Sequence, residues 1–455
     1  MKHCFFTRVL AVCLAVCLLP TLALAYNGDD TPVTRSELSL RLRLYPDGFP
    51  EDGAAHYADW AAFLDKISLR GVQDTQHLLM PLSRAYFDGG LCLNDELTLP
   101  FTYDGYSTFR YVRSPALGGA SVHFNTINFL QFMLKGYYFM GLPTQLIGLG
   151  MYPGATVEMA LKYRDAAAPL LEGQGSRAVS AQELQAVCER LDQIVQEDQN
   201  DKAYYFFTCL LIDLGASDLM LEKLACWEDW LEAMDPEGEG LQIEADGETE
   251  TWTLGQTTVF DKDESGFIAT LLDAEGYAYT LECRRDGDAL DAQLLVTLEE
   301  EERLNLTLTS EGLPLDGALE GNGWVELSLT GEALYEEVPD QRFLFRYARS
   351  AQALPYHTSL EVDWVHPQTG EAALGLCYEA DKEQQPSTVL IERRYDDQDD
   401  FFHLNESYIA EYKERFGKTL ALAAMPFVLE MPLGLYSDIV AFLDETGFLA
   451  FLGVE

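Results

Sequence analysis

Basic residues are scarce in this sequence. Its 455 residues include 30 lysines and arginines against 75 aspartates and glutamates, which gives a formal net charge of −45 at pH 7. A chain this acidic is repelled by nucleic acid and by anionic lipid head groups. We therefore exclude nucleic acid as a partner. Because the acids are spread along the whole chain, we interpret them mainly as a source of solubility.

Closely spaced metal ligands are also absent. The sequence contains no C-x-x-C pair, no H-x-H and no H-E-x-x-H arrangement, so it predicts neither a metal site nor a metal cofactor. The cysteines beyond residue 25 lie far apart, and we interpret them as buried thiols rather than ligands. They are Cys92, Cys188, Cys209, Cys226, Cys283 and Cys377.

Complete catalytic motifs are missing too. There is no G-x-S-x-G elbow, no S-x-x-K, no P-loop and no full Rossmann glycine pattern. The 75 acids offer no distinguishable acid–base pair, because glycosidase chemistry depends on the separation of two carboxylates in space. The sequence therefore predicts no catalytic residue and no cofactor, and it favours a protein that is not an enzyme.

Two polar groupings invite a metal-site interpretation. Residues 261–266 match the start of a calcium loop, but position twelve is Leu272, where calcium requires a bidentate glutamate. We interpret this segment as the polar tip of a hairpin. His357, Asp363 and His366 lie close together around a tryptophan, and we interpret them as polar residues at a strand end.

The N-terminus has the three regions of a secretory signal. Lys2 and Arg8 precede an apolar run over 9–19, and small residues occupy both ends of Ala23-Leu24-Ala25. This order predicts cleavage before Tyr26 and export to the extracellular space or the cell envelope.

Two alternatives to cleavage at this site follow from the same segment. The apolar run is shorter than the roughly 20 residues that a membrane-spanning helix needs, so we expect no transmembrane span in the mature chain. Residues 14–17 approximate a lipobox that ends at Cys17, although Val16 stands where a small residue is preferred. Lipidation at Cys17 stays open as an alternative.

The periodicity of the chain predicts four segments. Residues 1–25 form the signal, and 26–235 form a mixed α+β region. Residues 236–400 form an antiparallel β meander, and 401–455 form C-terminal helices that dock on the sheet. The Gly- and Pro-containing stretch 235–240 marks the main boundary.

The 26–235 region begins with strand-like alternation and ends in helices. Leucines alternate with polar residues over 36–45, which predicts a half-buried strand, and 54–67 has helical spacing. Short strands are expected at 85–93, 96–101 and 107–112, with turns at 88–90 and 118–119. Residues 180–234 read as helices, the first of them opened by a capping box of Ser180 and Glu183.

Period-two alternation dominates the meander region. Turn signals at 286–288, 321–323 and 368–370 separate its strands. The predicted strands are 251–260, 266–272, 277–284, 290–298, 303–310, 324–330, 342–350, 359–366, 371–379 and 388–395. This number of strands predicts a curved or closed sheet, because curling limits the exposed edges.

Two helical segments are more apolar than solvated helices should be. One is 127–140, and the other lies in the tail, where helices are expected at 407–416 and 437–448. Helices that are apolar on nearly every side need enclosure, and a curved sheet supplies it. The predicted fold is therefore α+β, a large curved antiparallel sheet (meander, half-barrel or barrel-like) packed on apolar helices. This arrangement resembles that of exported half-barrel carriers of lipids or lipoproteins.

Three functions remain open at this point. The first is an exported, non-enzymatic protein that binds an apolar, lipid-like ligand or an envelope protein. The second is a secreted hydrolase with paired carboxylates, and the third is a structural or adhesive surface protein. For the first function, we expect apolar side chains to line a cavity between sheet and helices. They are Phe129, Phe132, Met133, Tyr137, Phe442 and Phe448.

Overall fold

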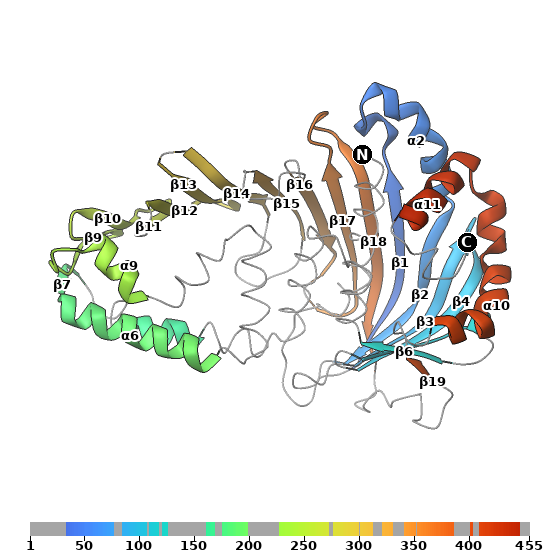
Figure 1. Ribbon diagram of the computed structural model, residues 1–455, viewed down its shortest axis with the longest axis horizontal. Coiled ribbons are helices and arrows are strands. Elements are labelled where there is room, and N and C mark those ends of the chain that lie inside the picture. The colour runs from blue at the N-terminus through green and yellow to red at the C-terminus, as the bar shows by residue number, and fades with distance from the viewer. Residues whose placement is uncertain are drawn as a thin grey trace. The chain divides into compact units, whose positions relative to one another are not determined.

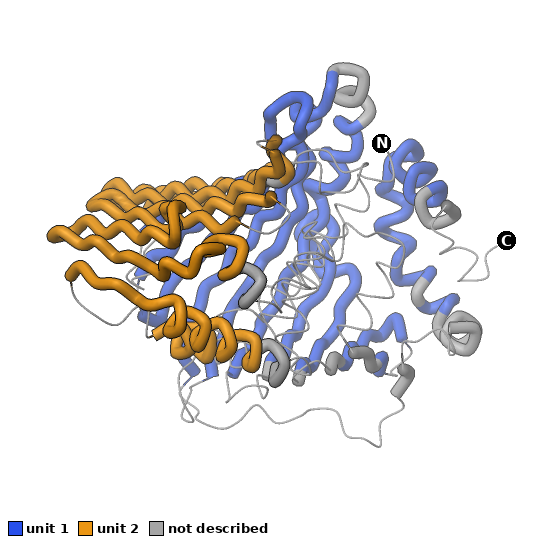
Figure 2. The backbone as a smooth tube through the Cα atoms, turned by 60° about the vertical axis from the view of Figure 1, so that its left-hand side comes forward, with its two compact units in different colours: residues 1–147, 316–322, 344–455 blue, residues 148–315, 323–343 orange. Residues whose placement is uncertain are grey.

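Antiparallel strands dominate the protein, and helices accompany them (Figure 1). The computed structural model describes residues 33–76, 84–106, 109–117, 121–125, 161–168, 175–198, 227–272, 276–299, 301–312, 321–330, 341–351, 353–385, 401–403 and 409–445. The chain forms two compact units, coloured separately in Figure 2. Unit 1 comprises residues 1–147, 316–322 and 344–455, and unit 2 comprises 148–315 and 323–343.

Unit 1 is built on a sheet that joins both ends of the chain. Its strands are β1 (Thr34–Leu44), β2 (Ile67–Gln76), β3 (Arg84–Leu93), β4 (Glu96–Tyr106), β5 (Phe109–Arg113), β6 (Ser121–Asn125), β17 (Tyr356–Val365), β18 (Ala372–Gln384) and β19 (Phe401–His403). They pair in the order β17-β18-β1-β2-β3-β4-β5-β6-β19. All of these pairs are antiparallel except β6 with β19. The first strand therefore lies between β2 and β18.

The alternation in β1 sorts the residues of this sheet onto two faces. Leu38 lies opposite Ala380 of β18 and Gly71 of β2, on a side that we call the apolar face. Arg41 lies opposite Cys377, on the other side, which we call the charged face. The predicted strand at 36–45 is thus confirmed, apart from its ends.

Glycines inside the sheet correct one prediction. The expected turn at 88–90 is wrong, because these residues lie within β3. Gly89 pairs with Gly71, and a Cβ on Gly89 would lie 2.1 Å from the carbonyl oxygen of Arg70. The Phe87 ring covers both glycines, since a Cβ on either would lie 2.7 Å from its Cζ. Glycine is present here for close approach between strands rather than for a turn.

A short helical corner covers one end of this sheet. A 3₁₀ turn η2 (Pro46–Gly48) ends β1, and helix α2 (Glu51–Leu64) follows. Phe49 packs against Tyr57 with ring centroids 4.2 Å apart, and the Tyr57 ring centroid lies 5.1 Å from that of Trp60. The helix expected at 54–67 is confirmed, but it ends earlier because Ile67 begins β2, a strand that the sequence did not reveal.

Two helices near the C-terminus complete the described part of unit 1. They are α10 (Ile409–Glu430) and α11 (Leu433–Glu445), drawn in red in Figure 1. α10 contacts β4 and the 3₁₀ turn η3 (Pro115–Leu117). The two predicted tail helices are therefore present, although α10 extends well beyond residue 416.

Unit 2 is a run of hairpins with helices beside it. Its helices include α6 (Ala181–Asp198) and α9 (Trp227–Met234), and residues 161–168 are helical as well. Its strands are β7 (Arg177–Val179), β8 (Leu241–Asp246), β9 (Thr249–Leu254), β10 (Thr257–Lys262), β11 (Gly266–Leu272), β12 (Tyr277–Asp286), β13 (Ala289–Leu298) and β14 (Glu301–Glu311). Two further strands, β15 (Gly321–Thr330) and β16 (Gln341–Arg349), have residues in both units. From β7 to β15, each strand pairs antiparallel with the next.

Most of the predicted meander strands are present, with two corrections. The segment 251–260 is two strands, β9 and β10, because Gly255 turns the chain with a φ of +57°. The expected turn at 321–323 is wrong, since these residues belong to β15. The expected strand at 388–395 lies outside the described residues.

The predicted capping box is confirmed at the start of α6. The Ser180 backbone N–H donates to Glu183 Oε2 at 2.9 Å, and the Glu183 N–H donates to Ser180 Oγ at 3.3 Å. These bonds hold the pKa of Glu183 below its ordinary value, because the hydroxyl and the backbone of Ser180 both stabilise the carboxylate. The apolar stripe of α6 faces inward through Leu184, Val187 and Leu191.

The stretch 235–240 is a fixed turn between helix and strand. Asp235 is buried, and its carboxylate accepts the backbone N–H groups of Glu239 at 2.8 Å and Gly240 at 2.7 Å. Gly240 has a φ of +80°, and a Cβ there would lie 2.5 Å from Val179 O. The change from helix to strand falls where the sequence predicted it. The domain limits drawn at this point stay a prediction.

A mostly antiparallel sheet with some helices is thus what the sequence predicted and what the structure has. The sequence also predicted that apolar helices pack on this sheet. Of the predicted apolar segments, the structure describes α10 and part of the tail that contains α11. The apolar segment 127–140 lies outside the described residues.

Candidate functional site

The structure does not test the six cavity-lining residues predicted from the sequence. Phe129, Phe132, Met133, Tyr137 and Phe448 lie outside the described residues. Phe442 belongs to α11, and nothing is described of its side chain. The predicted cavity therefore stays a prediction.

The C-terminal helices instead present an exposed apolar surface, which we call the α10–α11 surface. It consists of Leu422, Met425, Val428, Leu429, Leu433, Tyr436 and Val440. Leu422 is 70% exposed, Leu429 77% and Leu433 84%. Other exposed large apolar side chains of the described residues are scattered, at Leu97, Leu161 and Leu281. The expectation that the tail is sheltered by the sheet is therefore wrong for these side chains.

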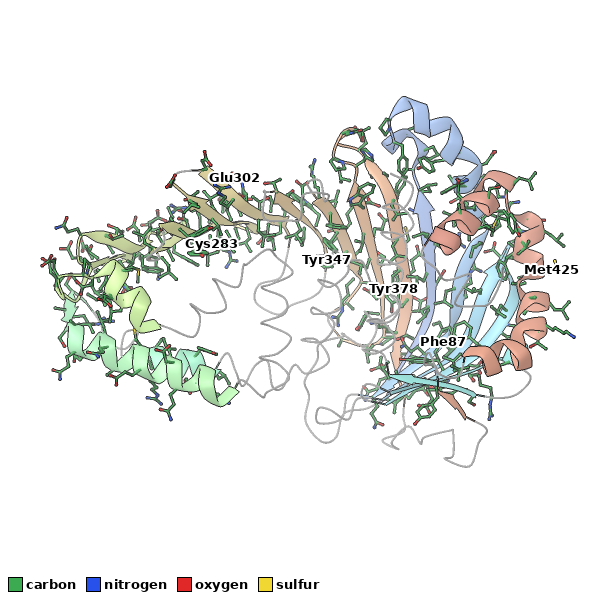
Figure 3. The ribbon with its side chains drawn as sticks, viewed as in Figure 1. Phe87, Cys283, Glu302, Tyr347, Tyr378 and Met425 are labelled. Carbon is green, nitrogen blue, oxygen red and sulfur yellow. The ribbon has the colours of Figure 1, made fainter. Side chains whose placement is uncertain are left out.

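Helical spacing explains why these residues share a side. Leu422, Met425 and Leu429 are three and four positions apart, so they lie on one face of α10, and Leu433, Tyr436 and Val440 repeat this spacing in α11. In Figure 3 Met425 projects from the outer side of α10. The sequence signal was the run of apolar residues at this spacing, but apolarity alone predicted burial.

Contacts on other sides hold the two helices in place. Leu435 is buried, at 4% exposure, and Lys66 Nζ lies 2.7 Å from Glu430 Oε2. α10 also contacts η3, where Ala116 and Leu117 are buried. The exposed side chains thus belong to anchored helices. No helix of the described residues is long and apolar enough to cross a membrane.

The charge pattern of this segment differs from that of the whole chain. Residues 419–429 contain no charged side chain, and they lie between Lys418 and Glu430. The chain as a whole carries a net charge of −45. The α10 part of the α10–α11 surface, over 419–429, is therefore uncharged, whereas α11 carries Asp438 between Tyr436 and Val440.

The charged face of the unit 1 sheet carries a network of ion pairs and hydrogen bonds around Asp363. Asp363 is 3% exposed, and its Oδ2 accepts a hydrogen bond from Arg346 Nη1 at 2.5 Å. The Tyr45 hydroxyl donates to Asp363 Oδ1 at 3.1 Å. Gly375 leaves the room for this contact, since a Cβ there would lie 2.5 Å from Asp363 Oδ1.

This network extends along β17 to Glu361. Arg43 Nη1 and Arg346 Nη1 lie 3.4 and 3.8 Å from the Glu361 carboxylate. Burial raises the pKa of the neighbouring Cys377 thiol to about 11, which keeps it protonated and unreactive near neutral pH. Both carboxylates are engaged by arginine, so this pair serves to hold strands together. The hydrolase alternative gains no support from it.

Tyr45 makes the stability of this network depend on pH in the alkaline range. Burial, followed by the charge of Asp363, raises the pKa of the Tyr45 hydroxyl to about 12 from an ordinary value of 10.0. The folded state therefore holds this proton more tightly, so the associated stability is present below pH 10 and lost as the pH rises through 12. We expect Tyr45→Phe to flatten the decline in the urea unfolding midpoint between pH 10 and 12.

The control for this prediction is Tyr436→Phe, because the Tyr436 side chain is 47% exposed. It should leave the pH dependence of the urea midpoint unchanged. An identical decline in the wild-type protein and Tyr45→Phe would contradict the prediction.

The predicted metal-like groupings have other roles in the structure. His357 contacts Asp381 at 2.9 Å, and Asp363 is held by Arg346 and Tyr45. His366 Nδ1 accepts the Gln368 N–H at 3.2 Å, so the three residues do not share a site. Within the described part of the chain, no three histidine, cysteine or acidic side chains are grouped to hold a metal ion.

The calcium-like segment is a hairpin tip, as the sequence predicted. β10 and β11 pair antiparallel across it. Asp263 Oδ1 accepts the N–H and the hydroxyl of Ser265, and Oδ2 contacts Arg284 at 2.8 Å. These bonds hold the pKa of Asp263 well below its ordinary value, the Ser265 hydroxyl contributing most. The carboxylate thus closes the turn.

The apolar face of the unit 1 sheet carries a compact cluster. Leu38, Phe87 and Ala380 are buried there, and Leu69, Phe101, Tyr103 and Tyr378 pack against them. Phe87 and Phe101 have ring centroids 5.3 Å apart, and Figure 3 labels Phe87 and Tyr378. Burial raises the pKa of the Tyr378 hydroxyl to about 12. We call these seven residues the aromatic cluster.

Comparison with known proteins adds no assignment to these surfaces. No protein-family model, no curated protein and no solved structure matches this chain.

Proposed function

We propose that this is an exported, non-enzymatic protein that binds a lipid surface through the α10–α11 surface. The observation that carries the proposal is the exposure of leucines on anchored helices, above all Leu429 at 77% and Leu433 at 84%. Water-exposed apolar surface that is contiguous marks a site for a partner or a membrane. The N-terminal pattern supports export.

The composition of the surface favours lipid over an envelope protein. Protein interfaces are enriched in tryptophan, tyrosine and arginine and carry a polar rim that forms hydrogen bonds. The α10–α11 surface is mainly aliphatic, with Tyr436 as its aromatic member. Apolar side chains of a surface-lying helix insert into the boundary between head groups and acyl chains without needing directional bonds.

Charge selects the type of lipid. A net charge of −45 opposes approach to anionic head groups, whereas it has little effect on zwitterionic ones. The uncharged stretch 419–429 lets the α10 part of the surface approach a neutral interface without desolvating a charge. We expect binding to phosphatidylcholine vesicles and weaker binding to vesicles that contain phosphatidylserine.

Leu433→Ala tests the proposal. Its side chain is 84% exposed, so removing it costs little folding stability. Losing its insertion into lipid should weaken binding about tenfold, since burial of a leucine contributes about 1.5 kcal/mol or more. Flotation of the full chain with phosphatidylcholine vesicles measures the effect.

Leu281→Ala is the matched control, because Leu281 is exposed on β12, away from α10 and α11 in the sequence. It should bind vesicles as the wild-type protein does. Absence of vesicle binding, or equal losses in both variants, would contradict the proposal. Concentration-dependent self-association without vesicle binding would assign the surface to a second copy of the chain instead.

A further inference from the structure

An ion pair ties the end of α10 to the segment between α2 and β2. Lys66 Nζ lies 2.7 Å from the Oε2 of Glu430, the last residue of α10. The Lys66 backbone is held on both sides, because its N–H donates to the Phe63 carbonyl at 3.1 Å and its own carbonyl accepts the Asn94 N–H at 2.8 Å. Phe63 is buried. The sheet region thus holds the cation in place, and the helix holds the anion.

This ion pair borders the α10–α11 surface. Glu430 directly follows Leu429 and stands three positions before Leu433, and these two leucines are the most exposed side chains of the surface. Both charges are accessible to water, since the Lys66 side chain is 39% exposed and the Glu430 side chain 44%. When the leucines enter a lipid interface, the two charges reach the level of the head groups, which is where charged side chains are tolerated.

The two charges act on a head group in opposite directions. An unpaired Glu430 carboxylate would be repelled by lipid phosphates, whereas Lys66 attracts them. For an anionic head group these two effects largely cancel. A zwitterionic head group can place its phosphate beside Lys66 and its ammonium group beside Glu430. The ion pair is therefore complementary to a zwitterionic lipid and gives an anionic lipid no advantage.

We propose that the Lys66–Glu430 ion pair determines the lipid preference of the α10–α11 surface by pairing with the two opposite charges of a zwitterionic head group. This inference rests on the proposed function, because it names the lipid class that the same surface takes. A surface ion pair contributes little to folding stability, so either charge can be removed from the folded protein. One basic residue near an anionic membrane strengthens binding about fivefold.

Single substitutions in the pair should shift lipid preference in opposite directions. The measured quantity is the affinity of the full chain for vesicles containing phosphatidylserine, divided by its affinity for pure phosphatidylcholine vesicles, both from flotation at one low salt concentration. Glu430→Gln leaves Lys66 unopposed and should raise this ratio about fivefold. Lys66→Met leaves Glu430 unopposed and should lower the ratio by a similar factor. The double variant Lys66→Glu/Glu430→Lys restores the pair and should return the ratio to that of the wild-type protein.

The matched controls remove the charges of another surface ion pair. Arg342 Nη2 lies 2.6 Å from Glu326 Oε2 in unit 2, and both side chains are partly exposed. Glu326→Gln and Arg342→Met change the net charge by the same amounts as Glu430→Gln and Lys66→Met. They should leave the ratio at its wild-type value, because their charges do not border the α10–α11 surface.

Equal weakening toward both vesicle types in Lys66→Met and Glu430→Gln would show that the pair only tethers α10, and this result would overturn the inference. An unchanged ratio in both variants, or the same shifts in the controls, would overturn it too. Wild-type protein that binds no phosphatidylcholine vesicles would remove the proposed function itself. Binding that is weakened by Leu433→Ala, with a ratio unmoved by Lys66→Met and Glu430→Gln, would leave the proposed function standing and remove this inference alone.

Discussion

Gly89→Ala is expected to lower the free energy of unfolding by about 3 kcal/mol, because it overpacks the middle of the unit 1 sheet. The new Cβ would lie 2.1 Å from Arg70 O and 2.6 Å from the Cα of Gly71. Both are backbone atoms of β2, so a side-chain rotation cannot relieve the overlap. β2 and β3 would have to separate locally, which also disturbs Phe87 and the aromatic cluster.

Urea unfolding monitored by tryptophan fluorescence measures this effect. The control is Gly370→Ala in the turn before β18, where a Cβ meets nothing within 4 Å and φ is +71°. It should cost only about 1 kcal/mol, the usual penalty for a left-handed backbone conformation. Equal losses in the two variants would show that close approach does not explain Gly89.

Asp235→Ala is expected to cost about 3 kcal/mol, since it leaves two backbone donors without their acceptor. The Asp235 carboxylate accepts hydrogen bonds from the backbone N–H groups of Glu239 and Gly240. Asp235 is only 6% exposed, so water cannot readily replace the lost acceptor. A bond to a charged acceptor contributes about 1.5 to 3 kcal/mol. Loss of both should loosen the turn between α9 and β8.

Limited proteolysis measures the loosening of this turn directly. In Asp235→Ala, cleavage within 235–240 should become at least tenfold faster than in the wild-type protein, because cleavage follows the population of the opened segment. Asp235→Asn retains one acceptor oxygen and should be intermediate. Glu237→Ala changes an exposed side chain of the same turn and is the control. Equal cleavage of Asp235→Ala and Glu237→Ala would contradict this account.

Many helices and strands could be predicted because the sequence pattern that specifies each of them involves only residues close together in the chain. The alternation of leucines in β1 and the Ser180–Glu183 box in α6 need only neighbouring residues. β2 was missed because its sequence, ISLRGVQDTQ, is mostly polar apart from Ile67, Leu69 and Val72 and resembles a loop. Its glycine is explained only by Gly89, which belongs to another strand.

The candidate sites depended on neighbours that are far apart in the chain. The residues of the α10–α11 surface are apolar, and sequence alone cannot tell whether anything covers them. Asp363 meets Tyr45 across 318 positions, so their contact has no local signal.

The position of β1 has a consequence for biogenesis. Its eleven residues pair with β18, so Thr34 lies opposite Gln384. Until the ribosome has added the segment 372–384, β1 lacks one of its two neighbours, and its hydrogen-bonding groups on that side remain open. Contacts this distant in sequence form slowly, because a large loop must close first. The nascent chain should therefore remain incompletely folded through most of its synthesis, a state that chaperones must protect from aggregation.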